Sequence, residues 1–464
     1  MASTKVDPSP HGVQSLLDTD LYKLTMQCAV LRSYPDAECT YGFTNRTPDL
    51  KLTRRGFEWL QERVAELANL RLSTDEAAFL KRKCPYLPQA YIAYISKFQF
   101  RPQEQLVLTF TPVLGGFSER LDAETDEAER SEEWGDLKID VKGKWVETIL
   151  YEIPLLVLVS ECYFRFSNTD WDYEGQEENA FQKGMQLLSN GCRFSEFGTR
   201  RRRSYHTQEL VLRGLIRAQE TYKSQNPSGP GALTGTSNVH FAHRFDLEPI
   251  GTVAHEWMMG IAALTGSYKT ANEIALEQWV GCFGAGNLSI ALTDTFGTPQ
   301  FLQSFQKPCK LISPPKTYAE IFAGVRQDSG DPTEFVKLMR RFYDSQGIKD
   351  KKTIVFSDSL DVQKCLEYKK SAEEHGFATS FGVGTFLTND FVHRSEKLKG
   401  KKSVPLNIVI KISSANGRPA VKISDNIGKN TGNQEEVKRV KAELGYQEKE
   451  WEEGDEMFRW GGKN

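Results

Sequence analysis

Apolar and polar residues follow different patterns in the two halves of the chain. In the first half, Leu21, Leu24, Cys28 and Leu31 recur at helical spacing behind Asp18-Thr-Asp. Carboxylates and a threonine ahead of such a pattern predict an N-capped helix of about three turns.

The next segments alternate between helix and strand patterns. Two charged, amphipathic stretches, 55–69 and 74–83, predict helices. Period-two alternation of Val, Leu, Ile and Thr over 106–114 and 138–158 predicts strands. Between them, 118–136 is rich in Asp and Glu and has almost no aliphatic residues, so we expect a solvated loop.

From about residue 182, the pattern becomes a repeat of strand, polar turn and helix, which is typical of βα units and a parallel sheet. The apolar strand cores end in six polar clusters: Phe197-Gly-Thr-Arg-Arg, Gly251-Thr-Val-Ala-His-Glu-Trp, Leu292-Thr-Asp-Thr-Phe, Val325-Arg-Gln-Asp-Ser-Gly-Asp, Phe356-Ser-Asp-Ser-Leu-Asp and Phe381-Gly-Val-Gly-Thr. Six units predict a (β/α) barrel, with an open doubly wound sheet as the alternative. The barrel is favoured because an open sheet concentrates its ligand motif at one switch point.

The repeat stops after Phe391. Residues 406–424 alternate around Asn416-Gly417, which predicts a hairpin that closes against the strands of the first half. The segment 435–464 is predicted to be a charged helix followed by a tail. We therefore predict three parts: a mixed α+β domain over 1–180, an α/β barrel whose mouth carries the chemistry over 181–395, and a hairpin and tail over 396–464 that pack back on the first domain.

Composition and charge exclude several classes of protein. The 464 residues carry 59 Lys+Arg and 62 Asp+Glu, a formal net charge of −3 at pH 7, which lacks the basic excess of proteins that bind nucleic acid or anionic membranes. The first residues do not resemble a secretory signal, and no apolar run reaches the roughly 18 residues of a membrane span. We expect a soluble, cytoplasmic protein, and a nuclear location is also compatible. Eight Cys without a CxxC pair argue against a disulfide framework and a zinc ribbon.

Candidate chemistry lies at the ends of the predicted strands, because loops at the carboxyl ends of a parallel barrel converge on one mouth. These ends supply cations, carboxylates and a bare glycine turn: Arg200 to Arg203, Arg326, Asp294, Asp328, Asp331, Asp358 and Gly382-Val-Gly384. Arginine can clamp a phosphate or carboxylate, carboxylates can hold Mg²⁺, and backbone N–H groups can cradle an anion. The combination favours a phosphorylated, anionic substrate.

Structural roles compete with these functional ones. The arginine run could be a solvated helix start, Asp331 could cap the helix that Pro332 begins, and Asp358 could be a cap as well. Arg326 and Asp328, by contrast, share a strand end without a capping role, so we assign both to the site.

His255 is the histidine whose position suggests chemistry. It follows the strand-like segment 250–254 and is predicted to face the mouth, with an ordinary packed histidine as the alternative. Neither a Walker loop nor a dinucleotide glycine motif is present, so any nucleotide must bind by another route.

Together, these motifs resemble the nicotinate phosphoribosyltransferase family. The resemblance covers roughly residues 14–428 and rests, in order, on Asp18-Thr-Asp-Leu-Tyr22, Phe197-Gly-Thr-Arg-Arg, Gly235-Thr-Ser-Asn, Gly251-Thr-Val-Ala-His-Glu-Trp, Arg326-Gln-Asp-Ser-Gly-Asp, Phe356-Ser-Asp-Ser and Phe381-Gly-Val-Gly-Thr385. It implies an α/β barrel of the type II phosphoribosyltransferase kind, with a second mixed α+β domain built from the N- and C-terminal segments. It also implies the reaction of nicotinate with 5-phosphoribosyl 1-pyrophosphate to nicotinate mononucleotide and pyrophosphate, coupled to ATP hydrolysis, in NAD biosynthesis.

The resemblance implies roles for residues that contact the substrates. Nicotinate contacts fall on Tyr22, Thr252 and Arg326, and a phosphoribosyl contact falls on Thr385. We expect Gly384 and Thr385 to cradle the ribose 5-phosphate through main-chain N–H groups and the threonine hydroxyl.

Catalysis is implied to centre on His255, which corresponds to the family's phosphorylated histidine. Four further positions match residues that line the same mouth in this family and in the related nicotinamide enzyme: Arg200, Asp294, Asp328 and Asp358. Of these, Asp294 and Asp328 are implied to be catalytic together with His255. We expect Mg²⁺ to arrive on the substrate pyrophosphate, with no protein ligand assigned to it, and ATP to be a co-substrate. Glu256 is predicted to orient the ring of His255.

Three alternatives remain at this point. A quinolinate-using transferase should need a larger cationic cluster because quinolinate has two carboxylates, and a nicotinamide-using transferase would differ in its pyridine substrate. A catalytically inactive barrel that serves as a scaffold would be expected to lose His255 or Arg326, and both are present. No nucleic-acid or membrane partner is expected, and the chain is predicted to be a monomer or a homodimer.

Overall fold

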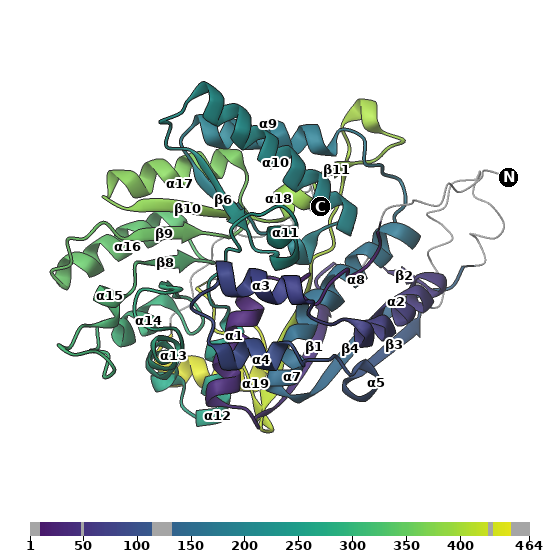
Figure 1. The fold of residues 1–464 in the computed structure, drawn as a ribbon. Helices are drawn as coiled ribbons and strands as arrows, with labels where there is room; N and C mark the ends of the chain where they lie inside the picture. The colour runs from purple at the N-terminus through teal and green to yellow at the C-terminus, as the bar shows by residue number, and fades with distance from the viewer. Residues whose placement is uncertain (1–9, 48–50, 114–131, 426–429, 447–464) are drawn as a thin grey trace.

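Two sheets organise the fold of this computed structural model, which describes residues 10–47, 51–113, 132–425 and 430–446 (Figure 1). The antiparallel sheet comes from both ends of the chain and contains β1 (Glu38–Asn45), β2 (Leu52–Thr53), β3 (Leu106–Pro112), β4 (Trp134–Lys144), β13 (Ile408–Ala415) and β14 (Arg418–Pro419). The parallel sheet comes from the middle and contains β5 (Arg193–Glu196), β6 (Ala232–Thr236), β7 (Ile290–Leu292), β8 (Gly324–Gln327), β9 (Thr353–Phe356) and β10 (Ala378–Val383). A short ribbon is formed by β11 (Phe391–Val392) and β12 (Lys402–Ser403).

Helices connect these strands and cover them, and those predicted over 55–69 and 74–83 are confirmed. The helices and 3-10 turns are α1 (Leu21–Ser33), α2 (Arg54–Glu66), η1 (Leu67–Asn69), α3 (Thr74–Lys83), α4 (Gln89–Ile95), α5 (Pro102–Gln105), α7 (Trp145–Thr148), η3 (Ile149–Tyr151), α8 (Glu152–Phe166), α9 (Gln176–Ser189), η4 (Thr199–Arg201), α10 (Tyr205–Gln225), α11 (Val239–Arg244), α12 (His255–Thr265), α13 (Tyr268–Phe283), α14 (Thr298–Phe305), α15 (Tyr318–Ile321), α16 (Pro332–Ser345), α17 (Val362–Glu374), α18 (Thr385–Thr388), η5 (Lys397–Lys399) and α19 (Gln434–Leu444).

The predicted C-terminal hairpin is confirmed and pairs with the first strand of the chain. Asn416 and Gly417 both have positive φ, 46° and 75°, as a two-residue primed turn requires. Strand β13 then runs antiparallel to β1, from Cys39 opposite Ala415 to Asn45 opposite Ile408. The two ends of the chain therefore build one sheet.

The parallel sheet has the order β6-β5-β10-β9-β8-β7. Five of the six predicted strand endings are confirmed, but Gly251-Thr-Val-Ala follows no ladder strand, and the sixth strand is β6. The segment before Gly251 contributes only a parallel bridge from Pro249 to Thr236. The strand order is compatible with a barrel. The two outer strands, β6 and β7, do not pair within the described residues, so closure of the barrel stays a prediction.

The strand predicted over 138–158 is wrong beyond Lys144, where β4 ends and the helices α7 and α8 follow. Every residue from Glu152 to Phe164 is buried, so α8 is enclosed on all sides. A helix of this kind has no amphipathic period and cannot be told from a buried strand by pattern. Of the predicted acidic loop, 118–131 lies outside the described residues, and 134–136 belongs to β4.

The predicted helix α1 is confirmed, but its expected cap is wrong. Asp20 occupies the N-cap position without a side-chain capping bond and accepts instead from Ser237 Oγ at 2.7 Å. Asp18 forms a buried ion pair with Arg202. Tertiary partners thus take both carboxylates away from the helix start.

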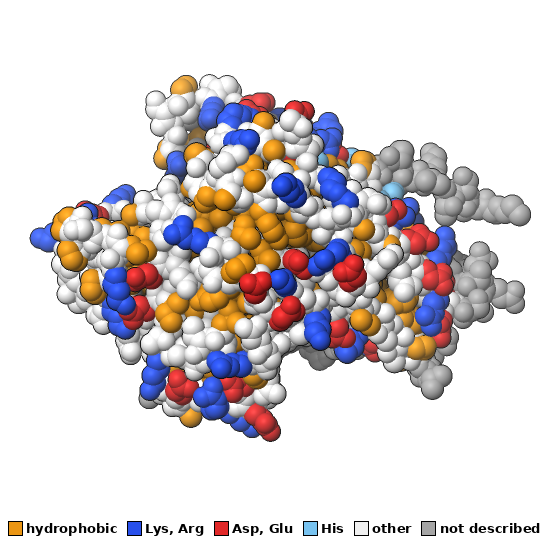
Figure 2. All heavy atoms as spheres, turned by 60° about the horizontal axis from the view of Figure 1, so that its bottom comes forward, with side chains coloured by type: hydrophobic (Ala, Val, Ile, Leu, Met, Phe, Trp, Pro, Cys, Tyr) orange, Lys and Arg blue, Asp and Glu red, His pale blue; other side chains and the backbone are white. Residues whose placement is uncertain are grey.

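Cysteines and surface charge agree with the composition. The eight cysteines are all buried, and none of them forms a disulfide. On the face drawn in Figure 2, Lys and Arg side chains are interspersed with Asp and Glu around an apolar middle. Within the described ranges, none of the helices combines the length and apolar character needed to cross a bilayer.

Candidate active site

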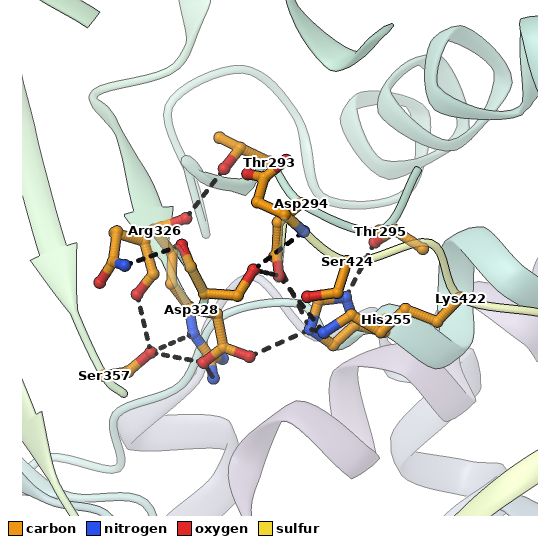
Figure 3. A network of polar contacts seen from close by, with 12 residues as sticks. His255, Thr293, Asp294, Thr295, Arg326, Asp328, Ser357, Lys422 and Ser424 are labelled. Carbon is orange, nitrogen blue, oxygen red and sulfur yellow. Dashed lines mark hydrogen bonds and ion pairs between the residues drawn. The ribbon is translucent and has the colours of Figure 1, made fainter. Parts of the chain in front are cut away.

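Polar side chains gather where β7, β8 and β9 end (Figure 3). Because the carboxyl ends of parallel strands meet at one edge, Asp294, Asp328 and Ser357 come together from distant parts of the sequence. His255 joins them as the first residue of α12, after Ala254 at the N-cap. The predicted strand-end position of His255 is therefore wrong, although its ring does lie beside the strand-end carboxylate of Asp328.

The C-terminal segment after the hairpin reaches the same place. The N–H of Ile423 donates to the carbonyl of Thr295 at 2.7 Å, and Ile423 forms a parallel bridge with Phe296. This pairing inserts Lys422, which is 5% exposed, among the carboxylates. A side chain from the end of the chain thus completes the cluster.

Four side chains surround the imidazole of His255. Its Nδ1 lies 3.0 Å from Thr295 Oγ1, and its Nε2 lies 3.0 Å from Asp328 Oδ2 and 2.9 Å from Lys422 Nζ. Asp294 Oδ1 is 3.8 Å from the same Nε2. Burial and the Lys422 ammonium lower the pKa of His255 to about 4, against the opposing effect of the two aspartates. The ring is therefore neutral near pH 7.

Arg326 is fixed by three neighbours. Its Nε donates to Ser357 Oγ at 2.7 Å, Nη1 to Thr252 Oγ1 at 2.9 Å and Nη2 to Asp328 Oδ1 at 2.7 Å. Burial alone would raise the pKa of Asp328, but Arg326, His255 and Lys422 together outweigh it and hold that pKa well below its ordinary value. These contacts use three of the five guanidinium N–H groups, which leaves two for a ligand.

Asp294 has an orphaned oxygen. Its Oδ2 accepts from Ser329 Oγ at 2.6 Å and lies 3.3 Å from Lys422 Nζ, while Oδ1 is buried without a hydrogen-bond partner among the described residues. Ligand atoms of His255, Asp294 and Asp328 lie within 4.8 Å of one another. Carboxylate oxygens suit Mg²⁺, so the two aspartates fit the expected ion, whereas an imidazole and a nearby ammonium do not.

A second charged group adjoins the first. The guanidinium of Arg200 on η4 is subject to the fields of Tyr22, Glu152 and Asp328, which outweigh burial and raise its pKa. Burial lowers the pKa of the Lys411 amine on β13 to about 7, with Arg200 and Lys422 adding repulsion and Glu152 opposing it. Arg200 therefore lies within the electrostatic reach of Asp328 in the His255 cluster, and Tyr22 lies near Arg200.

The other arginines of the predicted run do not reach the site. Arg201 donates to the carbonyl of Leu406, and Arg202 pairs with Asp18. The guanidinium of Arg203 lies 3.8 Å from the ring centre of Phe164. These three arginines connect α8, η4 and distant parts of the chain, and the site role of Arg200 stays a prediction.

Gly384 and Thr385 lie beside η4, at the end of β10. A Cβ on Gly384 would meet the carbonyl oxygen of Phe197 at 3.1 Å, so the backbone is closely packed there. Asp358 follows Ser357 and accepts from Ser359 Oγ at 3.2 Å.

The predicted role of Glu256 at the His255 ring is wrong. Its carboxylate points away and accepts from Tyr41, Trp145 and Lys23. Thr295, Asp328 and Lys422 contact the ring instead, and the sequence analysis missed Thr295 and Lys422. A lysine between the buried Val421 and Ile423 is a signal that could have revealed Lys422, and the same signal occurs at Lys411 between Ile410 and Ile412.

Comparisons with known proteins follow the same motifs. The profile of the nicotinate phosphoribosyltransferase (NAPRTase) family matches residues 192–448, and that of the NAPRTase N-terminal domain matches residues 17–160. The chain is 46% identical over 452 residues to a nicotinate phosphoribosyltransferase of Saccharomyces cerevisiae, covering 97% of this chain and 99% of the relative. It is 39% identical to one of Methanosarcina mazei, covering 92% and 97%.

Solved structures agree in fold. A crystal structure of a putative nicotinate phosphoribosyltransferase from Saccharomyces cerevisiae matches with a TM-score of 0.85 at 46% identity, over 95% of this chain and 100% of that chain. A nicotinate phosphoribosyltransferase from Porphyromonas gingivalis matches with a TM-score of 0.77 at 33% identity, over 93% and 100%.

Proposed function

The chain belongs to the nicotinate phosphoribosyltransferase family and is an enzyme of that kind, and we propose that it couples the transfer to ATP hydrolysis through a phosphohistidine. In this reaction, nicotinate displaces pyrophosphate from 5-phosphoribosyl 1-pyrophosphate and gives nicotinate mononucleotide. The phosphorylated residue is His255. The observation that carries the proposal is the neutral imidazole held between Thr295, Asp328 and Lys422.

A neutral, buried histidine is a competent nucleophile near pH 7, because a ring nitrogen keeps its lone pair. Attack on the γ-phosphorus of ATP forms a P–N bond and releases ADP. The Lys422 ammonium, 2.9 Å from Nε2, would then offset the charge that the phosphoryl group adds. Hydrolysis of the phosphohistidine returns the free ring.

The surrounding charges suit the transfer step. Nicotinate would dock its carboxylate on the remaining N–H groups of Arg326, with Tyr22 and Thr252 beside the pyridine. The pyridine nitrogen attacks the anomeric carbon with its own lone pair, so no general base is required. Arg200 would stabilise the pyrophosphate as it leaves, and Gly384 with Thr385 would hold the 5-phosphate.

Asp294 and Asp328 would hold Mg²⁺ together with the substrate pyrophosphate, since their carboxylates include the orphaned Asp294 Oδ1. The ion would neutralise the charge that develops on the leaving group. Asp358 lines the same mouth in this proposal. We also propose that the parallel sheet closes as a barrel through the segment after Pro249. The three domains then span 1–180, 181–395 and 396–464.

An initial-rate assay tests the function directly. Purified protein is given 5-phosphoribosyl 1-pyrophosphate with nicotinate, nicotinamide or quinolinate, each with and without ATP and Mg²⁺. We expect product only from nicotinate and a rise in turnover with ATP. Equal use of nicotinamide, or turnover that ignores ATP, would contradict the substrate or the coupling respectively.

A further inference from the structure

A buried carboxylate follows His255 directly in the chain and makes no contact with the ring described above. Glu256 is 7% exposed, and its Oε1 accepts from Tyr41 Oη at 2.6 Å and from Trp145 Nε1 at 2.8 Å. Its Oε2 accepts from Lys23 Nζ at 2.5 Å. One carboxylate on α12 is thus held by β1, α7 and α1 at once.

The lysine of this group is bound as tightly. Lys23 is 0% exposed, and its ammonium bridges Glu256 and Glu152 on α8. Burial alone would lower the pKa of Lys23, but the two carboxylates outweigh it and raise that pKa, so the amine is charged. Removing one partner of a buried ion pair strongly destabilises the folded protein, because the other charge stays buried without compensation. The three side chains are therefore held in one arrangement.

Packing fixes the same face of this helix, because Gly260 lies one turn after Glu256 and meets the same indole. A Cβ on Gly260 of α12 would meet the Trp145 ring at 2.4 Å, so only glycine admits the indole there. The Trp145 and Trp257 rings lie 5.9 Å apart. The first two turns of α12 are therefore held both by hydrogen bonds and by side-chain packing.

We propose that the Lys23–Glu256 ion pair positions the two halves of the site. Lys23 follows Tyr22 in α1, and Glu256 follows His255 in α12. The ion pair therefore fixes the position of Tyr22, on the nicotinate side of the pocket, relative to His255 on the phosphorylated side. Both are positioning residues, because neither side chain is required to touch a substrate. This inference rests on the proposed function of His255.

Two variants perturb the pair, and one matched variant serves as control. Glu256→Gln removes the charge and sets an amide donor against the donors of Lys23, Tyr41 or Trp145. Tyr41→Phe removes the hydroxyl that donates to Glu256 and preserves the charge of the carboxylate. It therefore tests the same contact even if Glu256→Gln folds poorly. Tyr318→Phe is the control, because the buried Tyr318 hydroxyl likewise donates to a carboxylate, Glu277 Oε2, at 2.6 Å, away from the site.

The first readout is the ratio of turnover with ATP to turnover without it, with the midpoint of unfolding measured alongside. We expect this ratio to fall about tenfold in Glu256→Gln and about threefold in Tyr41→Phe, while Tyr318→Phe keeps it. A merely structural role would lower the unfolding midpoint and leave the ratio unchanged.

The second readout is the ¹⁵N spectrum of the His255 ring, assigned by its loss in His255→Asn, which reports ring environment without any reaction. We expect the His255 signals to shift in Glu256→Gln and Tyr41→Phe but not in Tyr318→Phe. If ATP does not change the turnover of the wild-type protein, the proposed ATP coupling fails. The ¹⁵N spectrum alone then tests the positioning role. Unchanged His255 signals in both perturbing variants would overturn the positioning role.

Discussion

The parallel sheet and the C-terminal hairpin bring opposite charges to one site. The ends of β7 and β8 supply the carboxylates Asp294 and Asp328, whereas the hairpin and the segment after it supply the amines of Lys411 and Lys422. The first set follows the general rule that chemistry gathers at strand ends. The second arrives from the end of the chain. The parallel sheet thus supplies the carboxylates and Arg326, whereas the ammonium beside His255 comes from a segment near the end of the chain.

Removing Lys422 should have the largest effect. Lys422→Met leaves Asp294 and Asp328 without their ammonium and takes the cation from beside His255, so we expect ATP-stimulated turnover to fall about 100-fold. The pKa of His255 should also rise above about 4, because Lys422 lowers it and the aspartates raise it. Steady-state kinetics and an NMR titration measure the two effects. Lys438→Met, an exposed lysine on α19, is the control and should match wild type.

Arg326→Lys should change which pyridine is used. The lysine keeps the charge but loses the fork that pairs with a carboxylate, a difference of about 1–3 kcal/mol in a desolvated pocket. We expect the ratio of kcat/KM for nicotinate over nicotinamide to fall by about tenfold or more. Arg340→Lys on α16 makes the same exchange away from the site. A ratio and a nicotinate affinity that both stay at the wild-type level would remove Arg326 from substrate recognition.

Gly384→Ala tests the phosphate side of the pocket. The added Cβ would lie 3.1 Å from the Phe197 carbonyl oxygen, so the turn must shift by a few tenths of an ångström. We expect binding of 5-phosphoribosyl 1-pyrophosphate to weaken about tenfold in calorimetry, with nicotinate binding retained. Gly281→Ala is matched in contact distance, since its Cβ would lie 3.2 Å from Leu311, a flexible side chain. Equal weakening in both variants would mean a general effect on folding.

Lys411 should make stability depend on pH. Its folded-state pKa is about 7, below the ordinary 10.5. Below pH 7 the amine is charged in both the folded and the unfolded state, so the full free-energy cost of burying that charge opposes folding. From pH 7 to 10.5 the folded state loses this proton first, and the cost declines by about 1.4 kcal/mol per pH unit. Lys411→Met should therefore stabilise the protein most below pH 7 and progressively less above it. Urea unfolding at pH 6 and pH 9 measures the difference, and an equal gain at both would contradict it.

The sequence alone predicts the half of the site that obeys local rules. Strand endings located Asp294, Arg326 and Asp328, and an Asn-Gly turn located the hairpin. Helix α8 was missed because a helix buried on all sides has no amphipathic period. Lys422 was missed because its function depends on where a distant segment packs, which no local pattern encodes. Arg202 and Arg203 are candidates in the sequence because they follow a strand ending, but their partners are internal.

Phosphate incorporation from γ-phosphate-labelled ATP shows whether His255 is phosphorylated. Wild-type protein and His255→Asn are incubated with the label and Mg²⁺, and protein-bound phosphate is counted before and after brief acid treatment. The account predicts acid-labile label on the wild-type protein, located on His255 by peptide mapping, and none on the variant, which keeps a slow transfer that ATP does not stimulate. Label on His255→Asn at the wild-type level would contradict it.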